Sequence, residues 1–143
     1  MEIRELYQQL IIDHSKNPKN FGALKNADFH AEGINPLCGD SYEVFIKIED
    51  SKIAEMKFTG SGCAISKSSA SLMTESVKGK SKKEALVMME DFRNLLSGEG
   101  KKDLGKLSVF RGVHDYPSRV KCASLVWFTM AAALNKKKNV STE

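Results

Sequence analysis

The sequence predicts an α+β fold in which a small, antiparallel, three-stranded sheet is covered by helices. Two segments of alternating polar and apolar residues, joined by a short turn, indicate a β-hairpin. Apolar residues at helical spacing near the start of the chain and near its end indicate covering helices. The 143 residues are expected to form one domain over positions 1–135, followed by a flexible polar tail over positions 136–143.

The first half of the chain supplies a helix and the sheet. The helix is expected over residues 2–14, where apolar side chains recur on one face. After a loop that contains Pro18, a short strand is expected over residues 29–34. Regular alternation predicts a second strand over residues 42–49, and a third strand over residues 53–59 pairs back on it.

The second half of the chain is expected to be mainly helical. A helix rich in small residues is predicted over residues 63–77. Ser81 and Glu84 have the spacing of a capping box, which opens a helix that extends to Leu96. A mobile connection that contains several glycines follows. The last helix is expected to begin near Pro117, because proline is favoured in a first helical turn.

The composition indicates a globular protein without an obvious surface for large charged or lipid partners. Hydrophobic residues make up 41% of the chain and charged residues 28%, which is typical of a chain that folds around a core. The net charge of +4 comes from lysines with which no aromatic residues interleave, so no nucleic-acid partner is expected. The first residues do not resemble a signal peptide, and no apolar run could cross a bilayer. We therefore expect a cytoplasmic protein with no membrane partner.

The three cysteines all fall at boundaries of the expected elements. Cys38 lies in a loop before a strand, Cys63 at a helix start, and Cys122 in the first turns of the last helix. A helix N-terminus favours the thiolate, which is the form that binds metals and attacks sulfur. An odd number of cysteines cannot form a complete set of disulfides. The alternative is that all three are buried structural thiols.

Asp40 extends the cysteines to a set of four. It follows Cys38 by two positions, and side chains two apart in an extended chain point to the same side. Three thiolates and one carboxylate suit zinc, or one side of a small iron–sulfur cluster. The intervals between the cysteines differ from those of a compact zinc knuckle. The flanking residues are therefore needed to decide between a metal site and buried structural thiols. The candidate metal ligands are Cys38, Asp40, Cys63 and Cys122.

The segments that flank the cysteines resemble the U-type iron–sulfur assembly family, which includes IscU, SufU and the N-terminal domain of NifU. The resemblance rests on three motifs in order, Asn-Pro-Leu-Cys-Gly-Asp over residues 35–40, Gly-Ser-Gly-Cys-Ala-Ile-Ser over residues 60–66 and Arg-Val-Lys-Cys-Ala over residues 119–123. It extends from the first helix to about Leu134. The resemblance implies an IscU/SufU-like fold, and zinc or a cluster held by the three cysteines and the aspartate.

Two features make the chain more similar to SufU than to IscU. Lys121 stands where IscU has a histidine before its last cysteine, and an ammonium group has no lone pair with which to bind a metal. The interval that holds the Ser81–Leu96 helix is similar to the insertion typical of SufU. This resemblance implies a zinc-dependent sulfurtransferase that takes persulfide sulfur from a SufS-like cysteine desulfurase. Its other partners would be downstream iron–sulfur assembly proteins.

Two alternatives remain open, a scaffold on which a [2Fe–2S] cluster is assembled and transferred, with iron in place of zinc, and a structural zinc domain that acts as a binding module. On the sulfurtransferase hypothesis, Cys38 is the expected acceptor because a loop can move its side chain away from the ion. Asp40 is the ligand expected to yield to an incoming group. Arg119 is expected to assist catalysis, and Lys121 to stabilise the negative site. The alternative for both cations is an ordinary charge at a helix surface.

Overall fold

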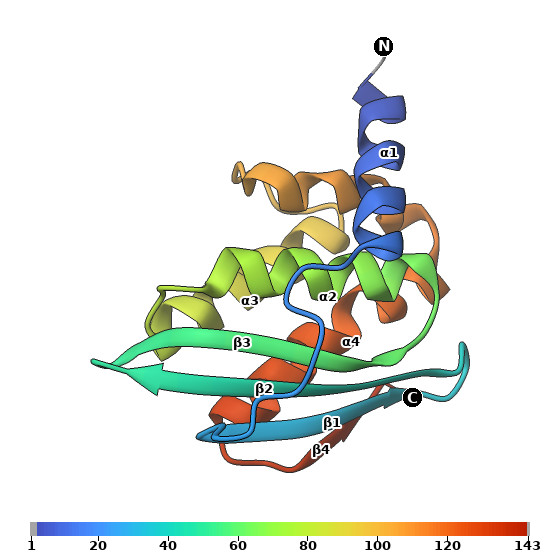
Figure 1. Cartoon of the computed structure of the whole chain (residues 1–143). Helices are drawn as coiled ribbons and strands as arrows, with labels where there is room; N and C mark the ends of the chain where they lie inside the picture. The colour runs from blue at the N-terminus through green and yellow to red at the C-terminus, as the bar shows by residue number, and fades with distance from the viewer. Residues whose placement is uncertain (1–2, 143) are drawn as a thin grey trace.

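The computed structural model describes residues 3–142. The elements of this part of the chain are α1 (Ile3–Lys16), β1 (Phe29–Asn35), β2 (Asp40–Glu49), β3 (Lys52–Ser61), α2 (Ala64–Val77), α3 (Lys82–Leu96), the 3₁₀ helix η1 (Gly105–Asp115), α4 (Pro117–Leu134) and β4 (Asn139–Ser141). The helices gather over one side of a single sheet, as Figure 1 shows, and the predicted α+β class is confirmed. None of the described helices is long and apolar enough to cross a membrane.

The sheet has four strands in the order β3-β2-β1-β4. The pairs β1–β2 and β2–β3 are antiparallel, whereas β4 pairs with β1 in parallel. The prediction of three strands is therefore wrong, because β4 forms within the stretch that was expected to be a flexible tail. Lys136 turns the chain after α4 with φ 62°, and backbone bonds such as Thr142 N to Ile34 O (3.0 Å) attach the returning segment. A strand of three residues has too few side chains to show an alternating pattern.

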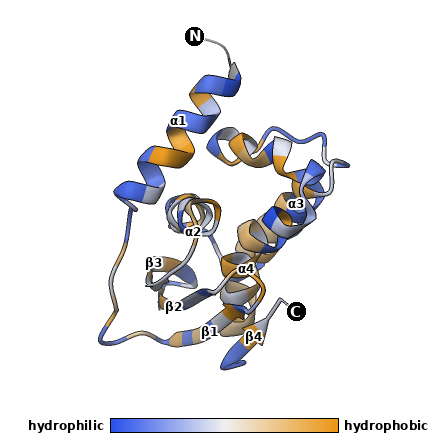
Figure 2. Ribbon diagram, turned by 90° about the vertical axis from the view of Figure 1, so that its right-hand side faces the viewer, coloured by the Kyte–Doolittle hydropathy of each residue, from blue (hydrophilic) through white to orange (hydrophobic). Residues whose placement is uncertain are grey.

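Alternation along the strands gives the sheet one buried and one partly exposed face. The long helix α4 lies against the buried face, and α2 lies between α1 and the sheet (Figure 2). The Trp127 ring stacks on Phe92 with 4.8 Å between centroids, and Phe110 meets Phe92 edge to face at 5.7 Å. Trp127 Nε1 donates to Ser69 Oγ at 3.2 Å, so α4 is attached to both α2 and α3.

Most helix boundaries agree with the sequence prediction. Ser81 caps α3 with both bonds of a capping box, and α4 begins at Pro117. The connection after α3 differs from the prediction because it contains η1, and η1 buries Leu107 and Phe110 in the core. The glycines of this connection permit turns, for example at Gly105 with φ 61°, but the segment is part of the packed structure.

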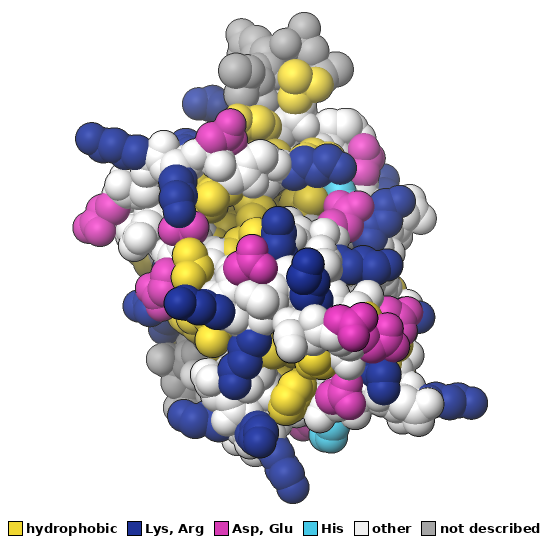
Figure 3. Space-filling view, turned by 90° about the vertical axis from the view of Figure 1, so that its left-hand side faces the viewer, with side chains coloured by type: hydrophobic (Ala, Val, Ile, Leu, Met, Phe, Trp, Pro, Cys, Tyr) yellow, Lys and Arg dark blue, Asp and Glu magenta, His cyan; other side chains and the backbone are white. Residues whose placement is uncertain are grey.

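The two ends of the sheet have different surroundings. At one end, Asp40 pairs with Asn35 across β1 and β2, and the motif cysteines lie there. At the other end, Glu49 pairs with Lys52 in the hairpin, next to the start of α3. On that far side of the molecule, acidic and basic side chains are interspersed over the surface (Figure 3). A mixture of both signs is typical of a solvated face.

Candidate metal centre

The structure brings three of the four expected ligands together. One ligand atom from each of Cys38, Asp40 and Cys122 lies within 4.8 Å of the other two. Cys38 lies in the loop between β1 and β2, Asp40 begins β2, and Cys122 lies in the first half of α4. Their exposure differs sharply, because Cys38 is exposed whereas Asp40 and Cys122 are only 2% and 3% exposed. The group therefore has two buried members and one that solvent or a partner can reach.

Cys63, the fourth expected ligand, lies beside this group. It is half-buried and is the N-cap residue of α2, where its sulfur accepts a hydrogen bond from Ser66 N at 3.5 Å. Its own N–H donates to Asp40 Oδ1 at 3.0 Å. Cys63 is also one of the neighbours that raise the pKa of the Cys122 thiol. All four expected ligands thus lie at one end of the sheet, where α2 and α4 begin.

Asp40 is fixed by hydrogen bonds to both of its carboxylate oxygens. Oδ1 accepts from the Cys63 N–H and, at 3.2 Å, from Ser66 Oγ, whereas Oδ2 accepts from the Asn35 amide at 3.3 Å. The Tyr42 hydroxyl lies 2.8 Å from Ser66 Oγ. Since Ser66 donates to Asp40, Tyr42 is the donor in its bond to Ser66. These three donors fix the direction of the carboxylate.

Two glycines make the close approach of these segments possible. Gly39 has φ 72°, a left-handed conformation that glycine adopts without strain, and its N–H donates to the Asn35 carbonyl at 2.9 Å. Gly62 passes so close to Asp40 that a Cβ there would lie against Asp40 Oδ1 and 2.7 Å from the Tyr42 hydroxyl. The glycine before Cys63 is therefore required by the packing of the aspartate.

Burial dominates the electrostatics of Cys122 and Tyr42. It raises the pKa of the Cys122 thiol above its ordinary value, and the neighbouring Cys38, Asp40 and Cys63 raise that pKa further. Burial also raises the pKa of Tyr42, and its bond to Ser66 opposes this only in part. Tyr42 is thus protonated at neutral pH, as its role as a donor requires. A cation would offset the charge that accumulates when the Cys122 sulfur and its neighbours ionise.

The donor set fits a zinc ion or an iron–sulfur cluster. Two thiolates bound to tetrahedral zinc at about 2.3 Å lie roughly 3.8 Å apart, so a group within 4.8 Å needs shifts of only about 1 Å. Sulfur ligands favour zinc, copper(I) or iron–sulfur clusters over magnesium or calcium. Cys38, Asp40 and Cys122 would hold such a group, with Cys63 as the adjacent fourth ligand.

The two expected cationic residues do not join the ligands. The exposed Arg119 guanidinium lies over the Tyr116 ring, 4.8 Å from its centroid. Lys121 lines a groove between α3 and α4, together with Arg93 and Phe128. Within residues 3–142, neither cation makes a hydrogen bond or ion pair with the expected ligands.

Four residues that build the site were not predicted from the sequence. They are Asn35, Tyr42, Gly62 and Ser66. Asn35, Gly62 and Ser66 lie within the motifs around Cys38 and Cys63, so the motifs contained the signal. Tyr42 was predicted only as the first residue of the second strand, and no local pattern distinguishes it from the other apolar residues of that strand.

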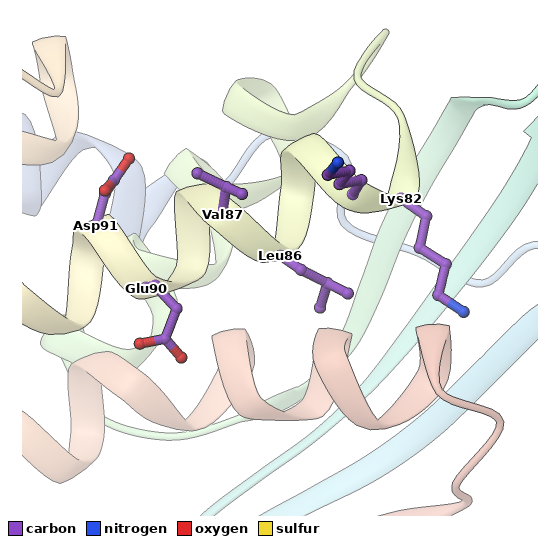
Figure 4. A pocket seen from close by; sticks show the side chains of 6 residues that line it. Lys82, Leu86, Val87, Glu90 and Asp91 are labelled. Atoms are coloured by element: carbon purple, nitrogen blue, oxygen red, sulfur yellow. The ribbon is translucent and has the colours of Figure 1, made fainter.

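A second hollow in the surface lies along α3, and none of the expected ligands lines it. It measures about 570 Å³ and is lined by residues of α3. The side chains of Leu86 and Glu90 point toward α4, and those of Val87 and Asp91 point away from it (Figure 4). Glu90 pairs with Arg93 at 3.2 Å, and Asp91 also has a basic partner. These acidic groups are already engaged, so the hollow has no convergent polar groups comparable to those around Asp40.

Comparison with known proteins identifies the family. The family described as NifU-like N terminal domain matches residues 6–123. The chain is 38% identical over 136 residues to the zinc-dependent sulfurtransferase SufU of Bacillus subtilis, covering 93% of this chain and 92% of that protein. It is 36% identical over 141 residues to the iron–sulfur cluster assembly scaffold protein IscU of Streptococcus pyogenes, covering 96% and 88%.

Solved structures agree with this result. A crystal structure described as a putative iron–sulfur cluster assembly scaffold protein for the SUF system of Fervidobacterium islandicum is 40% identical, with a TM-score of 0.84 over 93% of this chain and 99% of that one. A NifU-like N-terminal structure from Brucella abortus, 23% identical with a TM-score of 0.83, has the same fold over 94% of this chain and 95% of its own. The chain therefore belongs to the family of NifU-like N-terminal domains, the U-type family that includes IscU and SufU.

Proposed function

We propose that this protein functions in iron–sulfur cluster assembly as a zinc-dependent sulfur acceptor, which receives persulfide sulfur from a cysteine desulfurase. The observation that supports this function is the unequal exposure of the ligand group. Asp40 and Cys122 are buried, whereas Cys38 is exposed in a loop. A relay needs one sulfur that a partner can reach and others that keep the ion in place.

The transfer is a displacement at sulfur. The Cys38 thiolate attacks the outer sulfur of the partner's cysteine persulfide, and a new S–S bond forms on Cys38. The S–S bond in the partner breaks, and its cysteine leaves as a thiolate, so electrons balance without an external oxidant. Zinc, when bound, would keep the ligand sulfurs in the thiolate form at neutral pH.

The contacts favour Cys38 over Asp40 as the ligand that leaves. Movement of Asp40 would break its bonds to Cys63, Ser66 and Asn35. The loop of Cys38 is held by backbone bonds to the Asn35 carbonyl, and the Cys38 residue, whose side chain lies beside Cys122, is exposed. Asp40 is thus assigned to keeping the ion in place rather than to exchange.

Arg119 is assigned a supporting role in this transfer. It lies one helical turn before Cys122, is exposed, and has no acidic partner among residues 3–142. Its guanidinium could leave the Tyr116 ring to meet the negative charge of a persulfide. Lys121 faces the groove between α3 and α4, so we assign it to that surface.

The second candidate function is a scaffold for a [2Fe–2S] cluster. Relatives named as IscU scaffolds favour it, and the same four donors could hold iron. Against it, Lys121 stands directly before Cys122, where the resemblance to IscU would require a histidine. An ammonium group cannot complete a cluster site in place of imidazole.

The deciding experiment measures metal and sulfur acceptance on the same preparation. The aerobically purified protein is expected to be colourless, to contain about one zinc per chain, and to increase the turnover of a SufS-like cysteine desulfurase. The Cys38→Ser variant should remain folded but fail to increase turnover. Stoichiometric iron with visible charge-transfer absorption would instead support the scaffold. Zinc without any acceptance of sulfur would leave a structural zinc module.

A further inference from the structure

Asn35 contacts three of the four expected ligands. It is the last residue of β1, is fully buried, and pairs with Asp40 across the sheet. Its backbone carbonyl accepts hydrogen bonds from Gly39 N at 2.9 Å and Cys38 N at 3.3 Å. Its side-chain amide donates to Asp40 Oδ2 at 3.3 Å and to Cys122 Sγ at 3.6 Å. The residue is therefore a direct link between the cysteine loop, the sheet and α4.

The orientation of the Asn35 amide follows from its neighbours. If the amide were flipped, its oxygen would face Asp40 Oδ2, and two acceptors would meet. With the amide nitrogen toward the ligands, both of its hydrogens have an acceptor. The amide oxygen then has no hydrogen-bond partner in the described part of the chain. An unpaired buried carbonyl destabilises the fold, so the fold alone does not account for this side chain.

We propose that Asn35 is a positioning residue of the metal centre, whose amide holds Asp40 Oδ2 and Cys122 Sγ side by side before the ion binds. Asp40 Oδ1 already accepts from the Cys63 N–H and from Ser66, whereas Oδ2 accepts one bond, so Oδ2 is the oxygen that would be available to a metal ion. This inference rests on the proposed function in so far as it takes the ligand set to bind a metal. It goes further by naming the group that sets the spacing of two ligands from different elements.

The test uses Co²⁺ as a spectroscopic probe of the site. Asn35→Asp keeps the shape of the side chain but replaces the donor with an acceptor, and Asn35→Ala removes both. The matched control is Asn20→Asp, which makes the same change at an amide that donates to Thr74 Oγ1 at 3.0 Å, away from the cysteines. Affinity is measured by competition with a chelator, and thiolate coordination by the cobalt charge-transfer and ligand-field absorption.

Both Asn35 variants are expected to bind Co²⁺ about 10- to 100-fold more weakly than the wild-type chain, as is typical when a group that orients a metal ligand is lost. Their cobalt spectra should also change, whereas Asn20→Asp should match the wild type in both readouts. Circular dichroism of the metal-free proteins checks that the variants are folded.

Unchanged affinity and spectra in both variants would overturn the proposal. So would the unfolding of both metal-free variants, because Asn35 would then be a residue of the fold rather than of the site. Failure of the proposed function is distinguishable, since it would appear as a wild-type chain that binds Co²⁺ normally but accepts no sulfur. A wild-type chain that binds no Co²⁺ would refute both proposals.

Discussion

The helices α2 and α3 begin in different ways, and the difference marks the site. At the start of α3, Ser81 Oγ accepts from Glu84 N at 3.1 Å, and Glu84 Oε1 accepts from Ser81 N at 3.0 Å. This helix start is completed by its own residues. At the start of α2, the cap is the sulfur of Cys63, which accepts only a long bond of 3.5 Å.

Residues from another element complete the start of α2. The Cys63 N–H and the Ser66 hydroxyl both donate to Asp40 on β2, and Tyr42 on the same strand supports Ser66. Sulfur is a weak acceptor, so little is lost from the cap when Cys63 turns to a metal. A helix start that depends on distant residues and a weak cap is therefore suited to metal binding, whereas the start of α3 serves only the fold.

Of the changes considered, zinc removal should have the largest effect on stability, and it should affect the start of α2 but not the start of α3. The ion would join the β1–β2 loop, the start of α2 and α4, so the melting temperature is expected to fall by on the order of 10 °C on chelation. Hydrogen exchange should increase at the start of α2 and around Asp40 but not at the start of α3. Readdition of zinc should reverse both changes. An unchanged melt after verified zinc removal would contradict the cross-linking role.

Asp40→Ala should have the next largest effect. It removes the carboxylate to which Asn35, Cys63 and Ser66 donate, and of these donors Ser66 can still bond to the Cys63 carbonyl at 3.0 Å. The free energy of unfolding of the metal-free protein should therefore fall by about 3 kcal/mol. Urea unfolding measures this loss. The matched control is Asp103→Ala, which removes an exposed carboxylate that accepts one backbone N–H from Gly105 and should cost at most about 1 kcal/mol. Equal losses in the two variants would show that Asp40 does not organise the start of α2.

Gly62→Ala tests the close approach of the α2 start to β2. The added methyl group would collide with Asp40 Oδ1, so the free energy of unfolding should fall by about 2 kcal/mol, and zinc should bind more weakly. The control is Gly112→Ala, at a position where a Cβ meets no atom within 4 Å. If Gly62→Ala matches this control in both stability and zinc binding, the packing around Asp40 is looser than we infer.

Ser81→Ala should have the smallest effect and should separate the two helix starts. Loss of the cap of α3 is expected to lower the free energy of unfolding by about 1 kcal/mol. Zinc affinity should be unchanged because Ser81 lies at the hairpin end of the sheet, next to Lys52. A large loss of zinc affinity in this variant would mean that the two helix starts are coupled.

The two helix starts also differ in how far the sequence could predict them. The α3 start was predictable because a capping box needs only two residues at fixed spacing. The four candidate ligands were recognised from local motifs. The hydrogen bonds from Asn35, Ser66 and Tyr42 could not be predicted, because they join segments that only the fold brings together. The short strand β4 was missed because three residues are too few to show an alternating pattern.

The exposed Cys38 is expected to accept the sulfur while the buried ligands hold the ion. The most direct test incubates the zinc-loaded protein with a cysteine desulfurase and cysteine, alkylates the products, and locates the added sulfur by mass spectrometry of the digested chain. We expect the persulfide on Cys38, and none on Cys63 or Cys122 in either the wild type or Cys38→Ser. A persulfide found mainly on Cys63 or Cys122 would contradict the account.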